Sequence, residues 1–106
     1  MAEVRQIRAD EFEAEVMRSE TPVIVDFRAD WCYPCRMMEP VIEEIAREYE
    51  GKVKVVKVDV GEAADLATRF GVMSIPTLLF VKGGEVVERI VGAVPKGQIE
   101  RVIERL

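Results

Sequence analysis

The stretch Val23-Ile24-Val25-Asp26-Phe27-Arg28-Ala29-Asp30-Trp31-Cys32-Tyr33-Pro34-Cys35-Arg36 joins an apolar run to two cysteines that stand three residues apart. Its first five residues are almost continuously apolar, as in a central strand that is covered on both faces. Apolar residues then recur at helical spacing from Cys32 to Tyr49, and Pro40 inside this helix should bend it. The stretch therefore predicts a buried β-strand that leads into a helix beginning at the cysteines.

The rest of the chain alternates between further helices and strands. Predicted helices are Asp10–Met17 (with Asp10 as N-cap), Ala63–Phe70 and Gln98–Leu106; predicted strands are Val53–Val60, Thr77–Val81, Val86–Val91 and an edge strand at Val4–Ile7. Lys82-Gly83-Gly84-Glu85 is typical of a hairpin turn, and Gly51 and Gly71 should end helices. This order predicts an α/β fold in which helices cover both faces of a mixed sheet.

Length and charge limit the class of protein. The chain has 106 residues, which fits one domain over residues 1–106. Its net charge of -5 and its scattered Lys and Arg residues argue against binding to nucleic acid or to an anionic membrane surface. No apolar run approaches the ~20 residues that span a bilayer, and Met1-Ala2-Glu3-Val4-Arg5 lacks the features of a signal peptide. We therefore expect a cytoplasmic protein, and a monomer because no feature indicates oligomerisation.

Two residue types are missing from the composition. The chain has no histidine and no asparagine, while Glu, Arg and Val are abundant. This bias suggests a heat-adapted source. A melting midpoint above about 65 °C is therefore expected.

Cys32 and Cys35 stand at the predicted start of the helix. Residues i and i+3 of a helix share one face, with Cα atoms about 5–6 Å apart, which suits a disulfide. The helix N-terminus stabilises an anion, so the pKa of a thiol there should fall below about 8.5 and favour the attacking thiolate. We expect Cys32 to be the nucleophile, Cys35 to resolve the mixed disulfide, and Pro34 to stiffen the loop.

Other interpretations of the cysteine pair remain open at this point. Two cysteines can be buried without any redox role. A closed zinc site needs four ligands, whereas this chain has two thiols, no histidine and no second CxxC, so a metal would have to bridge two chains. We expect no metal and no cofactor besides a redox-active Cys32–Cys35 disulfide.

Asp26 interrupts the apolar strand just before the redox loop. A carboxylate at such a position should be desolvated and its pKa raised, which suits a general acid or base near neutral pH. The alternative is an aspartate at the end of the strand that faces solvent.

Several motifs in order resemble those of the thioredoxin family, and the resemblance covers essentially the whole chain. The segments that carry it are Val25 to Arg36, Lys57-Val58-Asp59-Val60, Gly71-Val72-Met73-Ser74-Ile75-Pro76-Thr77-Leu78, Gly84 and Gly92. The resemblance implies a three-layer sandwich, with a central mixed sheet of four to five strands flanked by four helices.

The resemblance also implies roles for residues of the cysteine site. Cys32 corresponds to the nucleophile, Cys35 to the resolving thiol, and Asp26 to the buried carboxylate that moves protons to and from the inner cysteine. Lys57 corresponds to the lysine near that carboxylate, although an ordinary outward-facing strand lysine is an almost equal alternative.

Further residues correspond to the substrate-binding side of the family. Pro76 matches the cis-proline beside the disulfide, and Ile75 before it would offer its backbone to an extended substrate. Trp31 resembles the aromatic residue beside the disulfide, with simple core packing as the alternative. Gly92 resembles a glycine on the substrate face, although backbone geometry is the favoured explanation of this residue.

Two positions depart from the family pattern. Tyr33 replaces a common glycine between the cysteines, which leaves the redox potential open and adds an amphipathic ring for substrate contact. Arg28 replaces a frequent aromatic residue. A cation there could lower the pKa of Cys32, but we expect Arg28 to be a solvated surface residue.

The sequence thus predicts a protein-disulfide reductase. Its dithiol would reduce disulfide-containing target proteins and be recharged by an electron donor resembling thioredoxin reductase. The alternatives are a more oxidising exchanger resembling glutaredoxin or an isomerase, and a non-catalytic binding module with the same fold.

Overall fold

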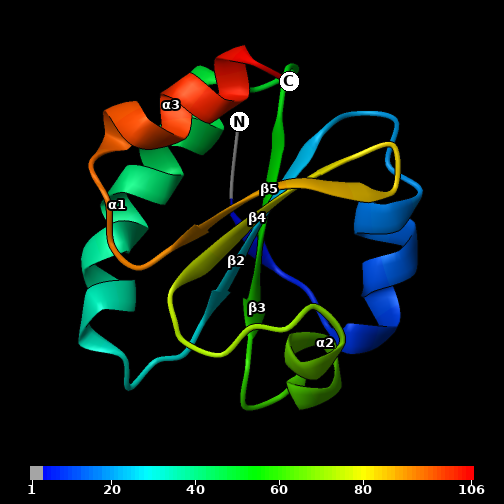
Figure 1. Ribbon diagram of the computed structural model, residues 1–106, viewed down its shortest axis with the longest axis vertical. Helices are drawn as coiled ribbons and strands as arrows, with labels where there is room; N and C mark the ends of the chain where they lie inside the picture. Colours follow the sequence, from blue (N-terminus) through cyan, green and yellow to red (C-terminus); the bar gives the residue numbers. More distant parts are fainter. Residues whose placement is uncertain (1–3) are drawn as a thin grey trace.

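The computed structural model describes residues 4–106 and shows a five-stranded mixed sheet between two layers of helices (Figure 1). The strands are β1 (Arg5–Gln6), β2 (Val23–Arg28), β3 (Lys54–Asp59), β4 (Thr77–Lys82) and β5 (Glu85–Val91); the helices are α1 (Tyr33–Glu48), α2 (Ala64–Arg69) and α3 (Lys96–Glu104). A fourth helical segment joins a 3₁₀ turn, η1 (Ala9–Glu11), to a π-helical turn, η2 (Glu13–Met17). The predicted α/β sandwich is confirmed.

The predicted central strand β2 lies in the middle of the sheet. The strand order is β1-β3-β2-β4-β5, in which β3 runs parallel to β1 and β2, whereas β4 is antiparallel to β2 and β5. All six residues of β2 are buried because the strand has neighbours on both edges and helices over both faces.

Alternation along β2 divides its side chains between two cores. Val23, Val25 and Phe27 pack with residues of η2 and α2. Ile24 packs with residues of α1 and α3, which lie together on the other face (Figure 1). Side chains two residues apart share a face of a strand, so Asp26 and Arg28 project toward the α1 side. This places two charged side chains beneath the helix that carries the cysteines.

The N-terminal helical segment differs from the prediction. Arg8 precedes it, and the Arg8 N–H donates to the Glu11 carboxylate at 2.8 Å. Asp10 lies inside η1 and its carboxylate accepts from Arg8 Nε at 3.0 Å, so the assignment of Asp10 as N-cap was wrong. An N-cap side chain accepts a hydrogen bond from a backbone N–H of the first turn, whereas the Asp10 carboxylate forms an ion pair with the neighbouring Arg8.

The ends of the other helices agree closely with the prediction. α1 ends at Glu48 and Gly51 follows in the turn with a φ of 88°. α3 begins at Lys96, two residues before the predicted start.

None of the helices within residues 4–106 is long and apolar enough to cross a membrane. Residues 1–3, which begin the segment tested for a signal peptide, lie outside the described residues.

Candidate active site

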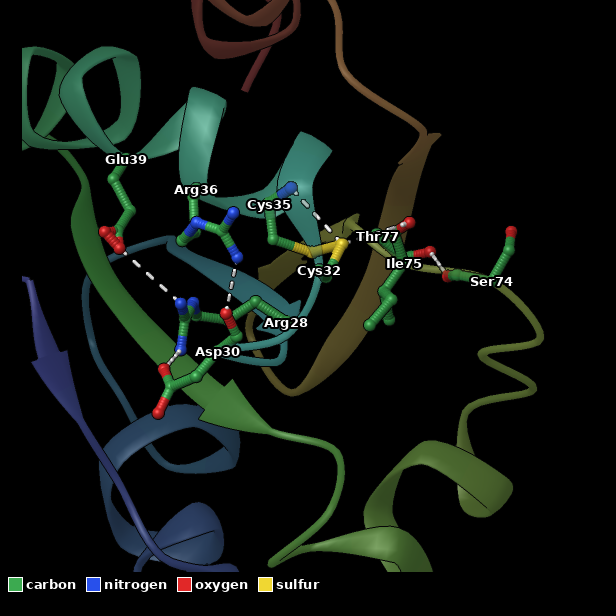
Figure 2. The surroundings of a disulfide bond; sticks show 9 residues. All are labelled: Arg28, Asp30, Cys32, Cys35, Arg36, Glu39, Ser74, Ile75 and Thr77. Carbon is green, nitrogen blue, oxygen red and sulfur yellow. Dashed lines mark hydrogen bonds and ion pairs between the residues drawn. A yellow bond between two sulfur atoms is a disulfide. The ribbon is translucent and has the colours of Figure 1, made fainter.

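Cys32 and Cys35 form a disulfide at the start of α1 (Figure 2). Cys32 is the N-cap residue, Pro34 is the second residue of the helix, and the two Cα atoms are 5.2 Å apart. The predicted spacing is therefore confirmed. A dithiol at these positions can close with little backbone movement, because the Cα separation already suits a disulfide.

The helix N-terminus is directed at the outer sulfur. The Cys35 N–H donates to Cys32 Sγ at 3.3 Å. The N-terminal end of the helix dipole also stabilises negative charge on this sulfur. Cys32 is 6% exposed and Cys35 only 1%. In the disulfide form both sulfurs are therefore largely covered, and an approaching thiol reaches Cys32 first.

Asp26 is buried beneath α1, and its side chain is 2% exposed. Its Oδ1 has no hydrogen-bond partner within the described part of the chain. Burial raises the pKa of Asp26 to about 7, while the charges of Arg28 and Lys57 lower it and that of Glu39 raises it. The predicted burial and raised pKa are confirmed, and the solvent-facing alternative is wrong.

Lys57 lies beside Asp26 in the sheet. The two residues are register partners on the parallel strands β2 and β3, so their side chains share one face. Lys57 is partly buried, and its charge lowers the pKa of Asp26. The structure thus brings Lys57 to the carboxylate, as the resemblance implied.

Arg28 is a buried residue, and the expectation of a solvated surface arginine was wrong. Its side chain is 3% exposed, with Nη1 2.8 Å from Asp30 Oδ1 and Nη2 3.5 Å from Glu39 Oε1 (Figure 2). The sequence held a usable signal: Arg28 has the same strand parity as Asp26, and acidic residues follow at positions 30 and 39. Burial is tolerated because both guanidinium ends find carboxylates.

The loop before β4 comes close to the cysteine pair. The Ile75–Pro76 peptide bond is cis, as the resemblance implied. The Ile75 carbonyl oxygen lies 3.9 Å from Cys32 Sγ, although 43 residues separate them. Thr77 Oγ1 donates to the Ser74 carbonyl at 2.6 Å and fixes the loop.

Gly92 lies next to this loop. Its N–H donates to the Pro76 carbonyl at 2.8 Å, and its φ of 91° favours glycine. Gly92 therefore adjoins the cis-proline, and backbone geometry is sufficient to explain the residue type. Its use in substrate binding stays a prediction.

Two aromatic rings flank the cysteines on the outside. Trp31 is 76% and Tyr33 63% exposed, so the alternative of core packing for Trp31 is wrong. Trp31 and Ile75 line a groove of about 180 Å³ together with Met73, which the sequence reasoning missed as a site residue and which is almost fully exposed. Its position three residues before Pro76 was the available signal.

The described residues 4–106 contain no group of three or more His, Cys, Asp or Glu side chains that could hold a metal. The described residues do contain a disulfide-bonded cysteine pair at a helix N-terminus and a buried, protonatable carboxylate on the strand before it. Such a site can carry out thiol–disulfide exchange.

Comparison with known proteins agrees with this geometry. The family model described as Thioredoxin matches residues 3–105. Thioredoxin 1 of Nostoc sp. is 49% identical over 105 residues, covering 99% of this chain and 98% of the relative. The thioredoxin of Haemophilus influenzae is 47% identical over 105 residues with the same coverage. The chloroplastic M-type thioredoxin of Pisum sativum is 46% identical over 103 residues, which are 60% of that longer chain. The chain therefore belongs to the thioredoxin family, and its Cys32–Cys35 pair is the redox couple of a thiol–disulfide oxidoreductase.

Proposed function

We propose that the protein works in the reducing direction, as a protein-disulfide reductase. The observation that carries this proposal is the helix N-terminus at Cys32, with Cys35 one turn further on and the buried Asp26 beneath them. The helix end stabilises a thiolate, which is the species that attacks a disulfide. The carboxylate supplies a proton acceptor whose pKa of about 7 matches neutral conditions.

The reaction divides into two exchanges. The Cys32 thiolate attacks one sulfur of a target disulfide, so a mixed disulfide forms and the other target sulfur leaves as a thiolate that takes a proton. Asp26 then accepts the proton of Cys35, whose thiolate attacks Cys32 Sγ. The Cys32–Cys35 disulfide forms, and the second target sulfur leaves as a thiolate that also takes a proton. The target gains two electrons and two protons, and the reverse exchange with an electron donor restores the dithiol.

The residues around the pair are proposed to bind the target. An extended segment of the target would lie along the backbone of Ile75 and beside Pro76 and Gly92, as an added strand does. The exposed rings of Trp31 and Tyr33 would contact its apolar side chains. Pro34 would hold the loop between the cysteines rigid, and Lys57 would adjust the protonation of Asp26.

The partners follow from this cycle. An electron donor resembling thioredoxin reductase would recharge the disulfide, and disulfide-containing proteins would be the targets, with no external cofactor. We propose that the protein acts as a monomer in the cytoplasm.

A trapping experiment tests the assignment of the two thiols. The Cys35→Ser variant should accumulate a mixed disulfide with a target, because Cys32 attacks and no thiol remains to resolve it. Cys32→Ser is the matched control and should accumulate none. The adducts are counted on non-reducing gels and by mass spectrometry. If Cys32→Ser were the variant that trapped targets, the roles of the cysteines would be reversed.

A more oxidising exchanger is the second candidate, because Tyr33 and Arg28 depart from the family pattern beside the cysteines. The potential of the pair separates the two functions. A reduction potential of about -270 mV fits the reductase, and a potential of about -180 mV or higher fits the oxidant. A non-catalytic binding module would instead keep its activity after both cysteines are changed to serine.

A further inference from the structure

Arg28 is a buried cation that the proposed reaction does not use. It ends β2 and projects from the same face as Asp26, and these two are the buried charged side chains among residues 4–106. Its Nε has no hydrogen-bond partner within the same residues. Burying a charged side chain with an unpaired donor costs free energy of folding. Replacing a buried ion pair by apolar residues often leaves the stability unchanged or increases it. Stability alone therefore gives a weak reason for an arginine at this position.

The guanidinium connects the two segments that carry the cysteines. Asp30 lies in the loop two residues before Cys32, and Glu39 lies on α1 four residues after Cys35. Arg28 Nη1 is 2.8 Å from the Asp30 carboxylate and Nη2 is 3.5 Å from that of Glu39.

A second arginine also bonds to this loop. Arg36 Nη1 donates to the main-chain carbonyl of Asp30 at 2.8 Å. The side chain of Asp30 is 89% exposed, so solvent screens its charge, but its position is fixed at both the carboxylate and the carbonyl. Figure 2 shows the Asp30 carboxylate bonded to Arg28 and the Asp30 carbonyl bonded to Arg36. The loop before Cys32 is thus tied to the strand below it and to the helix after it.

Arg28 is also a fixed positive charge next to the proton acceptor. The charged groups that act on Asp26 are Arg28 from its own strand, Lys57 from β3 and Glu39 from α1, and its register partner on β4 is the apolar Leu78. Arg28 and Lys57 lower the pKa of Asp26, and Glu39 raises it. Arg28 itself stays charged: burial lowers its pKa, but the hydrogen bond to Asp30 and the nearby carboxylates raise it more.

We propose that Arg28 is a positioning residue of the redox reaction, which holds the Cys32 loop against α1 and supplies a fixed cation to Asp26. The proposal rests on the proposed function, since it gives Arg28 a part in the proton transfer to and from Cys35. The side-chain hydrogen bonds of Arg28 within residues 4–106 go to Asp30 and Glu39 and to neither sulfur, so Arg28 acts through Asp26 and through Asp30. A neutral residue of similar length would remove both effects, and a lysine would keep the charge but lose the two-ended contact.

The charge is tested by titrating the Asp26 carboxyl group by NMR in the oxidised protein, which requires no turnover. Arg28→Met should raise the pKa of Asp26 by about one unit or more, because a nearby cation no longer favours the carboxylate. Arg28→Lys should keep most of the wild-type pKa. An unchanged Asp26 titration in Arg28→Met, with near-UV circular dichroism showing an intact fold, would overturn the proposal.

The loop contact is tested by a variant that keeps the guanidinium. Asp30→Ala removes the acceptor of the Arg28 Nη1 hydrogen bond and should speed hydrogen exchange of the Cys32 N–H, which bonds the Ala29 carbonyl at 3.2 Å, by several-fold. Equal exchange rates in Asp30→Ala and wild type would overturn the loop contact even if Arg28→Met did not fold. Disulfide reduction by the wild type is measured in parallel. Its absence would contradict the proposed function, whereas the titration and the exchange rates report on Arg28 alone.

Discussion

The protonation of Asp26 couples stability to pH at the scale of a single residue. The unfolded chain ionises an aspartate near its ordinary pKa of 3.8, whereas the folded protein keeps Asp26 protonated up to about pH 7. Between these two values the folded state binds the extra proton, so stability falls as pH rises and levels off above about pH 7. At about 1.4 kcal/mol per pKa unit, the three-unit shift corresponds to roughly 4 kcal/mol.

Asp26→Asn should therefore remove the loss of stability that Asp26 causes as the pH rises. We expect the variant and the wild type to differ by a constant amount below about pH 4. From about pH 4 to pH 7 the variant should gain up to roughly 4 kcal/mol relative to the wild type, because its side chain stays neutral. Urea unfolding of the oxidised proteins at pH 4, 5.5, 7 and 8 measures the difference. Parallel stability curves across this range would contradict the buried, proton-binding carboxylate.

The β4–β5 hairpin shows how one element depends on two glycines with different surroundings. Gly83 and Gly84 both have positive φ, 59° and 79°, which the predicted two-residue turn requires. A Cβ at Gly83 would meet nothing within 4 Å, but a Cβ at Gly84 would lie 3.1 Å from the Met17 carbonyl oxygen. Gly84 thus allows the hairpin to approach the end of η2 closely.

Substitution of the two glycines separates these effects. Gly83→Ala should cost about 1 kcal/mol, which is the strain of a left-handed alanine. Gly84→Ala should cost about 2 kcal/mol or more, because the same strain is joined by contact with a backbone atom that cannot move alone. Denaturant unfolding at one pH compares the pair. Equal losses would show that η2 adjusts to the added methyl group.

Ion pairs link distant parts of the whole molecule. Arg5 pairs with Glu11 at 3.1 Å and with Glu15 at 2.8 Å, and Lys54 on β3 pairs with the same Glu15 at 2.9 Å. Near α3, Lys96 contacts both Glu44 and Glu48 on α1. Single exposed pairs add little stability, but networks become more favourable at high temperature as the cost of desolvating charges falls.

These networks support the expectation of high thermal stability. We expect a melting midpoint above about 65 °C in low salt. Added NaCl should lower it, since exposed charges are screened within about 3 Å at 1 M ionic strength. Differential scanning calorimetry in 0.02 M and 1 M NaCl measures both effects. A midpoint below about 65 °C would contradict the heat-adapted interpretation, and an unchanged midpoint in salt would contradict a contribution from the networks.

Particular residues show how far the sequence could be interpreted. Asp26 was correctly predicted to be buried, because a charged residue inside an apolar run has no solvent-facing position on a central strand. Arg28 was placed wrongly, because a residue at the end of a strand reaches either solvent or the next helix. Asp10 was wrongly predicted to be an N-cap, because its carboxylate can accept from a backbone N–H or from Arg8, and in the structure it accepts from Arg8.

The sequence by itself determined the order of helices and strands, the central position of β2, and the pairing of Cys32 with Cys35 on one helical turn. These features depend on hydrogen bonding and side-chain periodicity over a few residues, which local patterns record. Only the tertiary structure decided that Ile75 approaches Cys32 across 43 residues and that Trp31 stays exposed. It alone also decided that Arg28 is buried between Asp30 and Glu39. The Ile75 contact joins segments far apart in the chain, and the exposure of Trp31 and the burial of Arg28 depend on how the helices pack on the sheet, so local patterns do not record them.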